Sequence, residues 1–129
     1  MAMERERLSA KVKAGLLAPY RNWHDRVAIN AFVKDIPATP KHRTWAVLER
    51  LEQSLDRFAA LPVMFVWGMR DWCFDPPCMH RLQMAMPHAR SVEIPDAGHY
   101  VMEDATEEVL AAIAEFTQAT SDSAQNAPA

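Results

Sequence analysis

The fold is decided by one apolar stretch in the middle of the chain, Pro62-Val63-Met64-Phe65-Val66-Trp67-Gly68. This stretch is apolar throughout, whereas a strand with one face in water alternates apolar and polar side chains. A strand that is apolar on both faces is typical of a parallel sheet covered by helices on both sides. The stretch therefore predicts a strand over 62–67, ended by Gly68, in an α/β fold.

The residues that follow extend this strand into a strand–helix–strand–helix unit. Residues 76–86 predict a short helix that begins at prolines, with Met79, Leu82 and Met86 facing inward. Residues 90–94 alternate polar and apolar, as in a strand near a sheet edge. Asp104 lies three residues before Glu107, which predicts the start of a last helix. Because a helix joins the two strands, we expect them to be parallel with a right-handed crossover.

The residues before this unit predict three helices. The first covers 4 to about 14 and is expected to end at Gly15. The second runs from Pro19 to residue 36 and has an apolar face at helical spacing, made by Trp23, Val27, Ala31 and Phe32. The third begins near Thr44 and also has an apolar face. From residue 119 to 129 small and polar residues predict a disordered tail.

Composition excludes several functional classes. The chain has 129 residues, 14 basic against 17 acidic, and a net charge of −3, which argues against a nucleic-acid partner. Its longest apolar run is too short to cross a membrane, and its N-terminus lacks a signal-peptide pattern, so we expect a cytoplasmic protein. The only cysteines, Cys73 and Cys78, with His80 nearby, lack the second ligand pair of a zinc module, so we predict no metal.

Two residues that carry chemistry follow the two predicted strands. Asp71 comes after the first strand and His99 after the second. Because both loops leave the carboxyl edge of a parallel sheet, and neighbouring strands lie about 4.8 Å apart, the two side chains can meet there. A carboxylate that binds one imidazole nitrogen fixes its tautomer and leaves the other nitrogen to act as a general base.

The sequence around these two residues resembles the α/β-hydrolase family. Residues 66–74 resemble its acid-bearing loop, Val66-Trp67-Gly68-Met69-Arg70-Asp71-Trp72-Cys73-Phe74. Residues 94–104 resemble its histidine loop, Ile94-Pro95-Asp96-Ala97-Gly98-His99-Tyr100-Val101-Met102-Glu103-Asp104. Residues 17–26, with Ile36-Pro37, are similar to the segment that leads from the cap into the core in haloalkane-dehalogenase-like members. The sequence of these segments is also similar to that of the subgroup that decarboxylates β-lactones to alkenes.

The resemblance implies roles for single residues. Asp71 would be the acid of the triad and His99 its base, in the chain order nucleophile, acid, histidine. Asp75 is the alternative acid if the loop is read differently. Trp72 and Phe74 would wall a pocket for a small apolar substrate, or else pack beneath the loop. The resemblance implies neither a cofactor nor a metal.

The nucleophile of such an enzyme has no match in this chain. The family carries an aspartate or a serine on a G-x-D-x-G or G-x-S-x-G elbow, and the chain contains neither pattern. We therefore expect the C-terminal portion of an α/β hydrolase, with its N-terminal half missing and no triad hydrolysis by this chain alone. Residues 1–18 would end the cap region, 19–118 would belong to the core, and 119–129 would form the tail.

A second hypothesis is that the chain has no catalytic role. It would then be a degenerate remnant, or a module that pairs the open edge of its sheet with another chain. An upstream sequence with a glycine-flanked nucleophile would favour the hydrolase.

Overall fold

The computed structural model describes residue 3 and residues 9–125. Within this range, residues 9–54 belong to one compact unit and residues 55–125 to another. The boundary predicted between residues 18 and 19 therefore falls inside the first unit.

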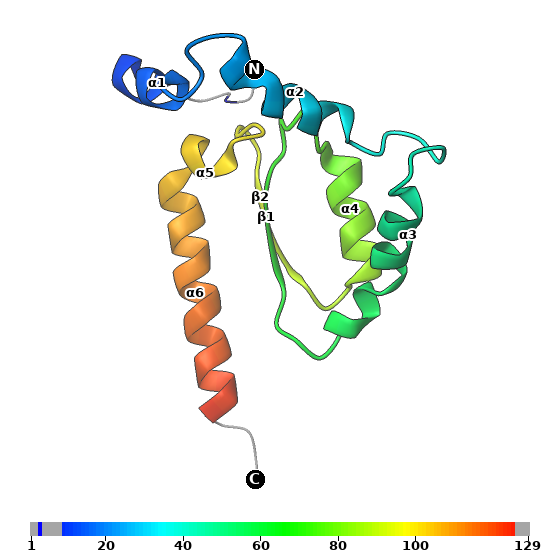
Figure 1. Ribbon diagram of the computed structural model, residues 1–129. Coiled ribbons are helices and arrows are strands. Elements are labelled where there is room, and N and C mark those ends of the chain that lie inside the picture. The colour runs from blue at the N-terminus through cyan, green and yellow to red at the C-terminus, as the bar shows by residue number, and fades with distance from the viewer. Residues whose placement is uncertain (1–2, 4–8, 126–129) are drawn as a thin grey trace. The chain divides into compact units, whose positions relative to one another are not determined.

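The unit of residues 9–54 is helical. Its elements are α1 (Ala10–Leu17), the 3₁₀ turn η1 (His24–Arg26), α2 (Val27–Lys34) and α3 (Trp45–Gln53) (Figure 1). Ser9 caps α1, because its side chain accepts a hydrogen bond from the backbone N–H of Val12. The expected end at Gly15 is wrong: the helix continues to Leu17, and the φ angle of Gly15 is not positive.

The predicted second helix is also shorter than expected. Instead of one helix from Pro19, the chain makes a loop before η1 and α2. In this loop the Asp25 carboxylate accepts hydrogen bonds from the backbone N–H groups of Arg21 and Asn22, while the Asn22 side chain accepts one from Asp25 N–H. Such local side-chain bonds to the backbone compete with helical ones, which accounts for the delayed start.

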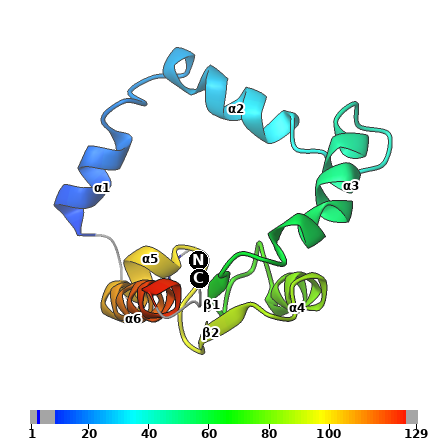
Figure 2. The ribbon, with the colours of Figure 1, turned by 90° about the horizontal axis from the view of Figure 1, so that it is seen from below.

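The unit of residues 55–125 has the predicted α/β arrangement. Its elements are η2 (Leu55–Phe58), β1 (Met64–Gly68), α4 (Pro76–Ala85), β2 (Arg90–Ile94), α5 (Val101–Asp104) and α6 (Thr106–Gln125). The strands are parallel and in register from Met64 opposite Arg90 to Gly68 opposite Ile94, so the prediction of parallel strands is confirmed. Helices α4 and α6 lie on opposite sides of the strands (Figure 2).

The core of this unit joins β2 to the C-terminal helices. Ile94, Ala97, Ala105 and Val109 are buried together, with Val66, Val92 and Val101 packed against them. Of the three side chains predicted to face inward, Met79 is fully buried, Met86 nearly so, and Leu82 only partly. The start of the C-terminal helices differs from the expectation, because a short helix, α5, precedes α6 and ends at Asp104. This core fixes the segment that carries His99.

Helix α6 reaches into the predicted tail. It continues to Gln125, so the expectation of disorder from residue 119 is wrong up to that point, and residues 126–129 lie outside the described residues. The side chains of this segment make helical contacts instead. The Gln118 amide donates to the Asp122 carboxylate one turn later, and the Ser121 hydroxyl donates to the carbonyl of Thr117.

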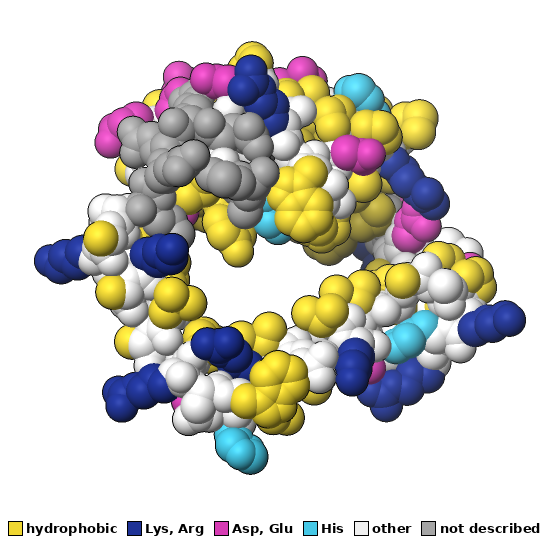
Figure 3. All heavy atoms as spheres, turned by 90° about the horizontal axis from the view of Figure 1, so that it is seen from above, with side chains coloured by type: hydrophobic (Ala, Val, Ile, Leu, Met, Phe, Trp, Pro, Cys, Tyr) yellow, Lys and Arg dark blue, Asp and Glu magenta, His cyan; other side chains and the backbone are white. Residues whose placement is uncertain are grey.

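Many large apolar side chains stay exposed (Figure 3). Trp23 and Phe32, predicted to share one apolar helix face, are 73% and 76% exposed, and Leu110 on α6 is 56% exposed. Within the described residues, no helix combines the length and the apolar character that a membrane crossing requires.

Candidate active site

The loops after β1 and β2 are joined at the carboxyl edge of the sheet. Past the strands, Met69 N–H donates to the Ile94 carbonyl and Arg70 N–H to the Ala97 carbonyl, each at 2.9 Å. These two bonds continue the strand ladder into the loops. As a result, Asp71 and His99 leave the sheet next to each other.

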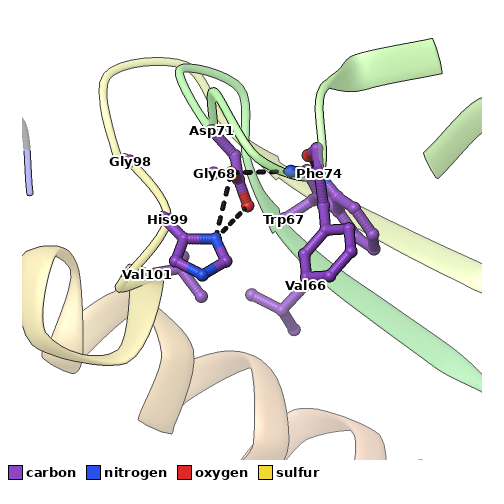
Figure 4. Close-up of a pocket in the computed structure, with 8 residues that line it drawn as sticks. All are labelled: Val66, Trp67, Gly68, Asp71, Phe74, Gly98, His99 and Val101. Atoms are coloured by element: carbon purple, nitrogen blue, oxygen red, sulfur yellow. Dashed lines mark hydrogen bonds and ion pairs between the residues drawn. The ribbon is translucent and has the colours of Figure 1, made fainter. Parts of the chain in front are cut away.

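Asp71 and His99 make the predicted contact. The His99 Nδ1 atom lies 3.0 Å from both carboxylate oxygens of Asp71 (Figure 4). The side chain of Asp71 is 9% exposed and that of His99 is 25% exposed. An ionised carboxylate only accepts hydrogen bonds, so Nδ1 is the donor and carries a proton. The opposite nitrogen, Nε2, is turned away from the carboxylate, where it is available for proton transfer.

Two backbone groups hold the Asp71 carboxylate in place. Its Oδ1 atom accepts hydrogen bonds from the N–H groups of Cys73 at 2.7 Å and Phe74 at 2.9 Å. Burial raises the pKa of Asp71, but the hydrogen bonds from His99, Phe74 and Cys73 and the His99 charge together outweigh it, so the pKa lies below its ordinary value of 3.8. Asp71 is therefore an anion at neutral pH.

This lowered pKa predicts a pH-dependent contribution to stability. A carboxyl group whose pKa is lower in the folded state stabilises the fold above its unfolded pKa and loses that effect as the pH falls. We expect the difference in unfolding free energy between the native chain and Asp71→Asn to be largest well above pH 3.8 and to shrink below it. Urea titrations across this range measure the difference. Asp56→Asn, at an exposed position, is the control, and an equal pH trend in both variants would contradict the prediction.

The loops approach closely at Gly68. A Cβ atom on this residue would lie 2.4 Å from the carbonyl oxygen of Gly98 and 2.7 Å from that of Ala97. Both are backbone atoms, which cannot rotate out of the way as the end of a side chain can. Only glycine fits where the acid loop crosses the histidine loop.

Aromatic rings surround His99. The ring centroids of Trp72, Phe74 and Tyr100 lie 6.1, 5.6 and 5.4 Å from that of the imidazole. Trp67 fixes this loop, because its indole Nε1 donates a 2.8 Å hydrogen bond to the Phe74 carbonyl. The imidazole therefore has three aromatic neighbours besides the Asp71 carboxylate.

A small pocket opens beside the pair. Its volume is about 170 Å³, and its lining is mostly apolar: Val66, Trp67, Gly68, Asp71, Phe74, Gly98, His99 and Val101. Of the two predicted pocket residues, Phe74 lines it, whereas Trp72 is absent from the lining and packs near the His99 ring instead. The contribution of Trp67 could not be read from the sequence, because its bond to Phe74 depends on how the loop turns.

The remaining candidates have other contacts. Asp75, the alternative acid, caps α4, since its side chain accepts a hydrogen bond from Cys78 N–H. The same carboxylate raises the pKa of the Cys78 thiol. Cys73 and Cys78 are both free and exposed, and no three potential metal ligands gather within the described part of the chain.

The chain is similar to a family of known proteins. The family model for the alpha/beta hydrolase fold matches residues 3–106. The chain is 39% identical over 87% of its length to a cis-3-alkyl-4-alkyloxetan-2-one decarboxylase of Xanthomonas campestris, and 33% identical over 93% to one of Shewanella oneidensis. A haloalkane dehalogenase 2 of Mycobacterium tuberculosis is 40% identical over 42% of the chain.

The coverage of these relatives is partial. The chain spans only 37% and 38% of the length of the two decarboxylases. Its helices and parallel strand pair are those expected of the C-terminal part of the fold. The match to the family model over most of the chain, together with these relatives, shows that the chain belongs to the α/β-hydrolase fold family and to its haloalkane-dehalogenase-like members.

Proposed function

We propose that this chain supplies the acid, Asp71, and the base, His99, of an α/β-hydrolase active site whose nucleophile lies outside these 129 residues. The observation that carries the proposal is the 3.0 Å contact between His99 Nδ1 and the Asp71 carboxylate at the carboxyl edge of parallel strands. Open α/β sheets bind their ligands at this edge.

The pair supplies a proton-transfer group. Asp71 fixes the tautomer that carries its proton on Nδ1 and stabilises the imidazolium that forms when Nε2 takes up a second proton. The His99 side chain is partly exposed, so Nε2 can reach a reacting group beside it. With a partly exposed imidazole and a buried counter-charge, the pair can both accept and return a proton during one turnover.

In this proposal, the nucleophile lies in a segment that corresponds to the part of the longer relatives that this chain does not match. The sequence contains no glycine-flanked serine or aspartate elbow, and the decarboxylase relatives are more than twice as long as the matched segment. That unmatched part would also add strands beside β1 and β2, because a two-stranded sheet is marginal by itself.

For the substrate we propose a cis-3,4-dialkyl oxetan-2-one, the compound class in the names of the two relatives matched over most of the chain. The apolar pocket and the aromatic rings around His99 suit alkyl groups. Decarboxylation opens the ring at the bond between O1 and C4 and at the bond between C2 and C3. It releases CO₂ and leaves an alkene, so no water and no cofactor is consumed.

A chimera tests the proposal. This chain replaces the matched segment in the Xanthomonas campestris relative, and the purified chimera receives a cis-3,4-dialkyl oxetan-2-one. We expect alkene and CO₂ in equal amounts, with His99→Ala inactive. A β-hydroxy acid as the only product would instead indicate lactone hydrolysis, and halide release from haloalkanes alone would indicate a dehalogenase.

The same proposal predicts that the 129-residue chain has no triad activity by itself. Without the nucleophile, the pair has only water to activate. We expect no turnover of a generic ester, a haloalkane or an oxetanone above the level of the His99→Ala chain. Turnover by the chain that disappears in His99→Ala would contradict the proposed division of the active site.

A further inference from the structure

A buried carboxylate lies on the histidine side of the site. Asp104 is the last residue of α5 and is 5% exposed. Its Oδ2 atom accepts a 2.7 Å hydrogen bond from the backbone N–H of Gly98, the residue before His99. A buried carboxylate needs polar partners, and the Gly98 N–H, next to His99, is one of those that Asp104 has.

Asp104 holds the chain on both sides of His99. Its side chain binds Gly98 N–H, and its own backbone N–H donates to the Tyr100 carbonyl at 2.9 Å. The two hydrogen bonds of Asp104 thus close a short ring through Gly98, His99 and Tyr100, with His99 between the two bonded residues. The backbone on each side of His99 is therefore hydrogen-bonded to the same residue.

The anchor of this ring is rigid. Ala105, which follows Asp104, is 2% exposed, and Ala97, which precedes Gly98, is completely buried. Both belong to the core cluster of Ile94 and Val109. Ala97 is also bonded to the acid loop through Arg70 N–H. Asp104 therefore connects the histidine loop to the same core that holds the acid loop.

We propose that Asp104 is a positioning residue for His99, which acts through the Gly98 amide and keeps Nδ1 in line with the Asp71 carboxylate. The inference rests on the proposed function of the pair. Asp104 itself transfers no proton in this proposal. Its contribution to His99 is the oxygen that accepts the bond from Gly98 N–H, which an asparagine side chain also supplies and an alanine does not.

Nitrogen NMR of the imidazole in the full chain tests this inference, because the ring resonances report which nitrogen carries the proton. In the native chain we expect the Nδ1–H form, and in Asp71→Asn we expect its loss. We expect Asp104→Ala to lose the Nδ1–H form and to expose the Gly98 amide to faster hydrogen exchange, and Asp104→Asn to restore both. Glu103→Ala, which removes a neighbouring exposed carboxylate on α5, is expected to change neither.

The outcomes separate this inference from the proposed function. If the native chain shows no Nδ1–H form that depends on Asp71, the Asp71–His99 pair itself fails. If the pair is present and Asp104→Ala keeps it, the positioning function is wrong. A general loss of amide protection in Asp104→Ala, including Ile94 and Val109, would also overturn the inference, because the carboxylate would then serve the whole core.

Discussion

In the Xanthomonas campestris chimera, Asp71→Asn is expected to lower kcat by roughly 10⁴-fold, the effect of replacing the acid of a triad by its amide. An asparagine can present its NH₂ group to Nδ1, which favours the tautomer with the proton on Nε2. That proton would occupy the nitrogen needed as the base. The side chain keeps its size, and the backbone N–H groups of Cys73 and Phe74 keep an acceptor oxygen, so the loop is expected to keep its conformation.

Asp75→Asn is the matched control for this substitution. Asp75 lies in the same loop and is the alternative acid by sequence, but its carboxylate caps α4. Asparagine is an equally good N-cap, so we expect the activity of the unmodified chimera. Steady-state kinetics on both variants measure the difference. A large loss in Asp75→Asn with little change in Asp71→Asn would reverse the assignment of the acid.

The sequence is sufficient to predict the strand pair and the meeting of Asp71 with His99. Two apolar segments joined by one helix leave few arrangements other than neighbouring parallel strands. Once β1 and β2 are parallel, the residues that follow them share one edge. The contact is therefore predictable from positions along the chain, without any side-chain packing.

The helices of residues 9–54 are harder to predict, for a physical reason. Helical spacing shows which residues share a face, as for Trp23 and Phe32, but not which segment covers that face. Both side chains are largely exposed in the structure. Helix ends depend on whether side chains or backbone carbonyls bind the backbone N–H groups. The Asp25 carboxylate binds two of these groups before α2, and the composition of the segment does not predict this.

The supports of the site are not visible in the sequence at all. The spacing of Asp104 indicates only a helix start, and the structure shows that its carboxylate binds Gly98 N–H. The pattern around Trp67 indicates only an apolar strand, yet its indole holds Phe74. Both bonds join residues whose distance is set by the tertiary fold, so no periodicity or local motif encodes them.

Gly68→Val is expected to separate the pair without changing either of its members. The valine Cβ would lie 2.4 Å from the Gly98 carbonyl oxygen and 2.9 Å from the Ala97 carbonyl carbon, so the histidine loop has to move. We expect a loss of stability of about 1–3 kcal/mol, typical of overpacking. A shift of about 1 Å in a catalytic group costs roughly 10²-fold in rate, which is the loss of kcat that we expect in the chimera.

Gly15→Ala is the matched glycine control. Gly15 lies inside α1, and an added Cβ would meet nothing within 4 Å. Because alanine is the better helix former, this change is expected to stabilise the chain by about 0.5–1 kcal/mol. Urea unfolding gives both stabilities, and the imidazole nitrogen resonances report whether Nδ1 still binds Asp71. If Gly68→Val keeps that bond and its kcat, the close approach of the two loops does not position His99. A valine that removes the bond while β1 and β2 stay paired would show that the missing Cβ atom at residue 68 is what lets the acid and the base meet.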